Sequence, residues 1–95
     1  MLGENECYLC RLFYGRSNTT GLHLHHIYPG TARRKLSDKY GLTVKLCPMH
    51  HTASSEGVHF NKANDLILKQ MAQEYYEANI GSRDDFRRDF IKSYL

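Results

Sequence analysis

LCPMHH, at residues 46–51, holds a cysteine and a histidine separated by two residues, and a second histidine follows at once. Near the start of the chain, CYLC at residues 7–10 repeats the two-residue separation with two cysteines. Two intervening residues let a tight turn or a first helical turn direct both side chains at one ion. This spacing predicts a structural zinc ion held by four ligands: Cys7, Cys10, Cys47 and His50.

The fourth zinc ligand has an alternative in His51, because a separation of three residues also suits zinc. We prefer His50 because this choice leaves His51 free for another role. A different interpretation is that the chain has three buried free thiols whose spacing is a coincidence. The length of 95 residues favours zinc, since so short a chain buries only about 60–65% of its unfolded surface and commonly needs a staple.

Composition places the chain among globular domains, with 41% hydrophobic and 24% charged residues. No apolar run approaches the roughly 18 residues that a membrane-spanning helix needs. The opening residues, MLGENE at positions 1–6, are acidic and lack the apolar core of a signal peptide. We therefore expect a cytoplasmic protein without membrane contact, in which thiols stay reduced and a CxxC pair favours metal over a disulfide.

Positive charge is concentrated in the first half of the chain. Residues 1–50 carry seven Lys or Arg and three Asp or Glu, whereas residues 51–95 carry six and seven. The basic half also contains most of the histidines, so it is the half expected to bind a polyanion. The alternative is an ordinary solvated surface.

The first half is expected to contain a short hairpin. Residues 7–10 predict a tight knuckle, followed by polar turn residues 15–21. Alternation over residues 22–28 predicts a strand with His23, His25 and Ile27 on one face, ended by Pro29-Gly30. Residues 31–40 are basic and are expected to contain a turn of helix, and residues 42–46 predict the second strand.

After Cys47, Pro48 suits the first turn of a short helix that carries His50 and His51. Asn61 is expected to cap a helix over residues 62–79, whose apolar stripe comprises Ile67, Leu68, Met71, Ala72, Tyr75 and Tyr76. The motif Ser82-Arg83-Asp84-Asp85 predicts the start of a last helix. Its expected buried face comprises Phe86, Phe90, Ile91, Tyr94 and Leu95.

The aromatic residues of these two C-terminal helices are interpreted as core or as the face of a homodimer. The alternative is a platform on which nucleic-acid bases stack.

One combination of motifs extends beyond the zinc ligands. HHIYP at residues 25–29 places a histidine dyad at the end of a strand, and LCPMHH at residues 46–51 places another histidine on a short helix after a second strand. Together with CxxC, this order resembles the HNH endonucleases whose finger is stapled by zinc. The resemblance covers roughly residues 7–55, and the whole chain also resembles small HNH-type proteins of phages and prophages.

The resemblance implies an α+β fold: a ββα-metal (His-Me finger) or treble-clef zinc finger with two C-terminal helices. It implies a single domain over residues 1–95, with a zinc-stapled core at about 5–57 and the helices at about 61–95. The implied activity is metal-dependent hydrolysis of DNA phosphodiester bonds with little sequence specificity.

The resemblance also implies residue roles. His26 matches the general base that deprotonates the attacking water, while His25 and His51 match ligands of a catalytic divalent ion: Mg2+, Mn2+, Ni2+ or Zn2+. Physically, an imidazole with an ordinary pKa near 6.5 supplies a neutral base at working pH. Arg33 and Arg34 follow the dyad and are candidates for contacts with DNA phosphates.

The chain departs from the family at the central asparagine, which commonly holds the loop that orients the base. Its position falls near Leu42, where Gly41-Leu42 offers no amide. This departure favours the alternative function, a non-catalytic zinc-finger module that binds nucleic acid.

The sequence leaves the roles of two further histidines, His59 and His23, open. His59 either completes the shell of the catalytic ion or is an ordinary packing residue. His23 either supports a ligand of the catalytic ion, or faces DNA, or is a simple strand residue.

Overall fold

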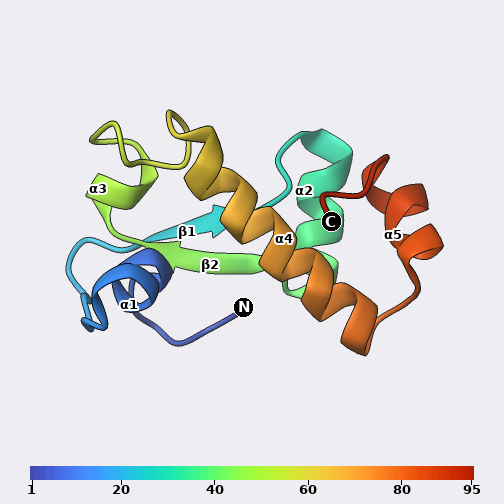
Figure 1. Ribbon diagram of the computed structural model, residues 1–95, viewed down its shortest axis with the longest axis horizontal. Helices are drawn as coiled ribbons and strands as arrows, with labels where there is room; N and C mark the ends of the chain where they lie inside the picture. Colours follow the sequence, from blue (N-terminus) through green and yellow to red (C-terminus); the bar gives the residue numbers. More distant parts are fainter.

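A two-stranded antiparallel sheet lies at the centre of the N-terminal half, in a computed structural model that describes residues 1–95. Strand β1 (His23–His26) pairs with β2 (Thr43–Leu46), with His23 opposite Leu46 and His26 opposite Thr43. The hairpin prediction is therefore confirmed, with each strand slightly shorter than its apolar pattern suggests. The protein is a small α+β structure (Figure 1).

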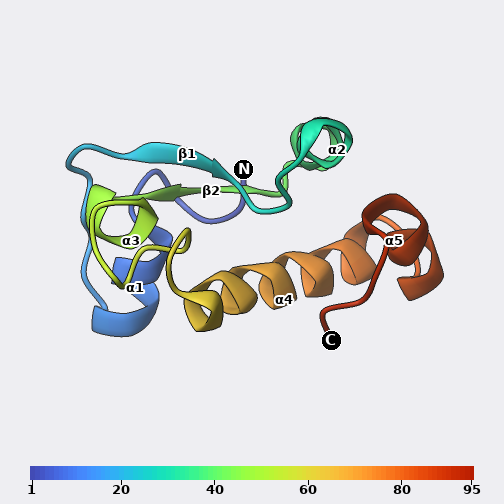
Figure 2. The same cartoon turned by 90° about the horizontal axis from the view of Figure 1, so that it is seen from above.

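The helices are α1 (Tyr8–Tyr14), α2 (Thr31–Tyr40), α3 (Pro48–His51), α4 (Lys62–Asn79) and α5 (Arg83–Phe90). Figure 2 shows α1, α3 and α4 on one side of the sheet, with no helix over the opposite side. Helix α2 connects the two strands beyond the end of the sheet, where it approaches α5 (Figure 2). The sheet therefore buries one face against the helices and leaves the other open, as the exposure of Leu24 shows.

Two local predictions underestimate the helical content. The knuckle at residues 7–10 is the first turn of α1, which Cys7 caps and which continues to Gly15, a residue at φ 62°. The segment 31–40 is helical throughout and ends at Gly41 at φ 69° rather than holding a single turn. Segment 31–40 is rich in Arg and Lys, residues of high helix propensity, and α1 contains two Leu and one Arg. Each helix stops at a glycine in the left-handed region that suits it.

The capping predictions for the C-terminal helices are confirmed. The Asn61 side chain accepts a hydrogen bond from the Asn64 backbone N–H at the start of α4. Ser82 and Asp85 form a reciprocal capping box at the start of α5, with side-chain contacts of 3.1 and 2.9 Å. These signals are local in sequence, which is why they predict the starts of both helices correctly.

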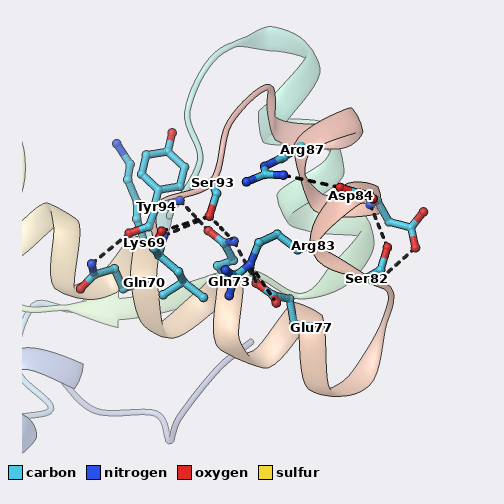
Figure 3. Close-up of polar contacts among 12 residues, drawn as sticks. Lys69, Gln70, Gln73, Glu77, Ser82, Arg83, Asp84, Arg87, Ser93 and Tyr94 are labelled. Atoms are coloured by element: carbon cyan, nitrogen blue, oxygen red, sulfur yellow. Dashed lines mark hydrogen bonds and ion pairs between the residues drawn. The ribbon is translucent and has the colours of Figure 1, made fainter.

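The core face of α4 differs in part from the predicted stripe. Leu68, Ala72 and Tyr76 are fully buried, but Tyr75 is 40% exposed. Gln73 is buried instead, and its amide joins α4 to the C-terminal segment by donating to Ser93 and accepting from the Tyr94 backbone N–H (Figure 3).

The predicted face of α5 is also wrong at its end. Phe86 and Phe90 are buried, but Ile91 is 68% exposed and Leu95 is 44% exposed. The helix ends at Phe90, and the φ of 77° at Ile91 turns the chain back toward α4, so helical periodicity no longer applies there. No helix of the protein combines the length and the apolar character that crossing a membrane requires.

Candidate metal centres

Cys7, Cys10, Cys47 and His50 form one buried cluster beneath the sheet. His50 Nδ1 lies 3.6, 3.4 and 3.4 Å from the three sulfur atoms, and the sulfur atoms of Cys10 and Cys47 lie 3.8 Å apart. A tetrahedral zinc ion with ordinary bond lengths separates its ligands by about 3.6 Å for nitrogen–sulfur and about 3.8 Å for sulfur–sulfur. The cluster therefore has the donors and the spacing of a structural zinc site.

Polar groups of α1 and of the segment that follows it lie beside two of these thiols. The Cys7 sulfur accepts from the Cys10 backbone N–H at 3.5 Å, and the Asn18 amide lies 3.7 Å from the Cys10 sulfur. Burial raises the pKa of Cys7 to about 11, so this thiol is protonated at neutral pH in the metal-free chain. A bound cation favours the thiolate, which means that zinc binding here would release protons.

Neighbouring histidines of α3 face different clusters. Successive side chains on a helix point about 100° apart, so His50 turns toward the sulfur atoms while His51 turns toward β1. The second ring nitrogen of His50, Nε2, has no hydrogen-bond partner, and the Glu56 carboxylate lies 3.8 Å from it. Of the two candidates for fourth ligand, His50 is thus the one placed with the cysteines.

His25, His51 and His59 form the second cluster, with one ligand nitrogen of each within 4.8 Å of the others. His51 Nε2 and His59 Nε2 are 3.1 Å apart, and the three ring centroids are separated by 4.7–5.5 Å. His25 is 6% exposed, and its Nε2 has no hydrogen-bond partner. A buried ring nitrogen without a partner, beside two other imidazoles, fits a site for a divalent ion.

The electrostatics favour the neutral forms of His25 and His51. Burial lowers the pKa of His25 to about 4, and repulsion from His51 and His59 adds to the effect. Burial likewise lowers the pKa of His51. Neutral imidazoles are the form that binds a metal, so His25 and His51 are ready to act as ligands at pH 7.

The second cluster opens into a cleft of about 310 Å³, which His26 and Arg34 also line. His26 Nε2 lies 2.7 Å from the Asp38 Oδ1 atom of α2. A neighbouring hollow of about 470 Å³ shares Arg34 and adds Lys35. Arg33, the other arginine expected to contact DNA, does not line either hollow.

A tight turn explains why His59 joins the cluster. The backbone N–H groups of Val58 and His59 donate to the carbonyls of His50 and His51, at 2.9 and 3.4 Å, which folds the chain back onto α3. A Cβ added to Gly57 would lie 2.6 Å from the His51 carbonyl oxygen, so only glycine permits this approach. The turn-forming run Ser54-Ser55-Glu56-Gly57 is the feature of the sequence that favours this return.

The loop after His26 is held without an asparagine. Leu42 is buried, its carbonyl accepts from the Ile27 N–H at 3.2 Å, and its own N–H donates to the Ser37 carbonyl at 2.8 Å. The Ser37 hydroxyl donates to the Tyr28 carbonyl at 3.3 Å. Backbone groups and one serine thus restrain the loop next to the candidate base.

We compared the chain with protein-family models, curated proteins and solved structures, and none of them matches it. The two ligand clusters, and the cleft into which the three-histidine cluster opens, are therefore the basis for assigning a function.

Proposed function

We propose that this protein is a metal-dependent endonuclease that hydrolyses DNA phosphodiester bonds. The observation that carries the proposal is the convergence of His25, His51 and His59 from separate segments at a cleft that also holds His26. Three imidazoles suit Zn2+, Ni2+ or Fe2+ better than Mg2+, which prefers oxygen ligands. The order of these residues also resembles that of HNH endonucleases.

The proposed scaffold is the zinc-stapled ββα-metal finger of that family. Zinc held by the cluster of cysteines and His50 would pin α1 to α3 across the hairpin. Because α3 carries a ligand of each cluster at adjacent positions, a structural ion on one side would orient His51 on the other. This arrangement supports a treble-clef assignment.

When bound, the second ion would supply charge neutralisation at the scissile phosphate and at the leaving oxygen. His26 would accept a proton from the attacking water through Nδ1. Its Nε2–H would donate to Asp38, which fixes the neutral tautomer with a free lone pair on Nδ1. Arg34, on the cleft wall, would hold a DNA phosphate.

Nicking of a supercoiled plasmid tests the proposal. The zinc-loaded protein should convert the plasmid to open circles when Mn2+, Ni2+ or Mg2+ is added, and it should not do so with chelator present. His26→Ala should lose about 10²- to 10⁴-fold in rate, the usual contribution of a general base, while keeping the zinc content of the wild type. Equal cutting by this variant would exclude His26 as the base.

The alternative function, binding of nucleic acid without cleavage, is favoured by the missing asparagine at Leu42. The same preparations should be tested for retention of labelled duplex in a gel. Retention without nicking in any of the metals would support the binding module and reject the endonuclease.

A further inference from the structure

The His51 ring is contacted at both of its nitrogens, and His23 provides the second contact. His51 Nε2 faces His59, whereas His51 Nδ1 lies 2.9 Å from His23 Nδ1. The ring planes of His23 and His51 are inclined by 68°, with centroids 5.1 Å apart. We infer that His23 is a positioning residue that orients His51 as a metal ligand, an inference that rests on the proposed second metal site.

The placement of His23 follows from the strand period. Residues two apart on β1 lie on the same face, so His23 and His25 both face α3 and flank His51. His25 supplies a nitrogen to the three-histidine cluster, but His23 does not belong to that group. The two ring nitrogens of an imidazole point in divergent directions, so an ion bound at His51 Nε2 cannot also be reached from the Nδ1 side. His23 is therefore a partner of the ligand rather than a fourth ligand.

The position of the proton on each ring decides which nitrogen donates in the contact between His23 and His51. A neutral imidazole carries one N–H, and a nitrogen that binds a metal must offer its lone pair. When His51 binds through Nε2, its proton must be on Nδ1, and it must donate to Nδ1 of His23. His23 is then the acceptor, with its own proton on Nε2.

This contact would fix both the tautomer and the orientation of the His51 ring. Metal-binding histidines usually donate their other N–H to a carboxylate, a carbonyl or a water, and losing such a partner typically weakens metal binding about 10- to 100-fold. No carboxylate lies within ion-pair distance of His51, so His23 is the side chain that fills this position.

Two substitutions of His23 distinguish the effect of its hydrogen-bond acceptor from the effect of its size. In His23→Asn the amide oxygen occupies nearly the place of Nδ1 and accepts a hydrogen bond, whereas His23→Leu has similar size and no acceptor. Titration calorimetry with Ni2+ on zinc-loaded protein should show about 10- to 100-fold weaker binding for His23→Leu and near wild-type binding for His23→Asn. Zinc content and melting temperature should stay close to those of the wild type in both.

The variant His51→Ala shows whether a negative result rejects the second metal site or only the role of His23. If the wild type binds no Ni2+ beyond zinc exchange, or if His51→Ala binds as tightly as the wild type, the second metal site and the role of His23 are both rejected. If His51→Ala abolishes binding but His23→Leu binds like the wild type, only the role of His23 is rejected.

Nitrogen-15 NMR of the rings gives a readout that simple packing would not change. With Zn2+ in the second site, His51 should be the Nδ1–H tautomer and His23 the Nε2–H tautomer. The opposite tautomer of His51 would overturn the inference even if affinity falls in His23→Leu.

Discussion

Two adjacent histidines of β1 are placed in different environments. His25 is buried under the sheet with a nitrogen that has no partner, whereas the side chain of His26 is partly exposed and contacts Asp38. Alternation along a strand is the cause, since neighbouring side chains point to opposite faces. The dyad can therefore combine a metal ligand with a base without the two competing for one position.

The pH dependence of stability should reveal the buried state of His25. Its pKa of about 4 in the folded chain lies below the ordinary value of 6.5, so the unfolded state binds more protons between these two values. The contribution of the neutral, buried His25 to the free energy of unfolding is therefore complete above about pH 6.5, and it is lost as the pH falls toward 4.

Urea denaturation at pH 7.5 and 5.5, without added second metal, measures this contribution. Relative to His25→Gln, which does not titrate, the wild type should lose about 1 kcal/mol between the two values. A constant difference between the two proteins would show that His25 is not buried as a neutral ring.

Asp38 should matter for catalysis more than for folding. Asp38→Asn keeps the size of the side chain but removes the negative charge that lies 2.7 Å from His26 Nε2. Hydrogen bonds to charged groups contribute about 1.5–3 kcal/mol, and the exposure of Asp38 to solvent places its bond to His26 near the lower end of that range. We therefore expect kcat to fall about tenfold. Plasmid nicking should show this loss with unchanged Ni2+ affinity, and a parallel loss of Ni2+ binding would instead indicate a disturbed metal site.

At the scale of elements, α3 and the loop that follows it bring the ligands together. Pro48 starts the helix, its two histidines serve the two clusters, and Gly57 lets the chain return so that His59 reaches His51. A Cβ at Gly57 would meet backbone atoms of His51 and Ser54, which cannot move aside as the end of a flexible side chain could.

Gly57→Ala should separate His59 from His51. The added Cβ would overlap the His51 carbonyl, so the loop must shift, at about 1–3 kcal/mol of stability. Ni2+ affinity should fall while structural zinc is retained, and Ser55→Ala in the same loop is the control. Calorimetry and urea denaturation measure both effects, and unchanged values would show that the loop tolerates the side chain.

Helix α2 contributes Arg34, the basic side chain that lines the histidine cleft. Arg34→Ala should weaken binding of duplex DNA and reduce the slope of log affinity against log salt by about 1, as for one lost phosphate contact. Arg87→Ala on α5, away from the cleft, is the charge-matched control. Equal effects of the two variants would mean that only net charge matters.

At the scale of the whole molecule, α4 runs from the loop that follows α3 to the connection with α5 (Figure 1). Tyr28, two residues after His26, packs against Phe86, Phe90 and Tyr94 with centroids 4.5–5.6 Å apart. Its hydroxyl donates to the Lys69 carbonyl of α4. The C-terminal helices lie outside the part of the chain that resembles HNH endonucleases. Through Tyr28 they nevertheless fix the backbone just after His26, the candidate base.

Removal of zinc should unfold the N-terminal half. Structural zinc contributes about 10–16 kcal/mol in small fingers, as much as the whole stability of a typical domain. A strong chelator, or Cys10→Ser, should lower the melting temperature sharply and abolish nicking, and added zinc should restore the wild type only. A chelated protein with an unchanged melting temperature would show that the cysteines hold no structural ion.

The sequence by itself determined the features that depend on neighbours along the chain. The Cys-x2-Cys and Cys-x2-His pairs, the caps at Asn61 and Ser82 and the strand alternation span one turn or one repeat each, so local backbone geometry is enough to place them. Where local geometry changes at a single residue, as at Ile91, the same reasoning failed.

Only the tertiary structure decided which histidines meet. The contacts of His51 with His23 and His59, and of His26 with Asp38, join segments whose closure depends on the packing of α3, α2 and the returning loop. Sequence spacing does not encode these distances, because each contact is stabilised by burial and backbone pairing elsewhere in the molecule rather than by the residues that form it.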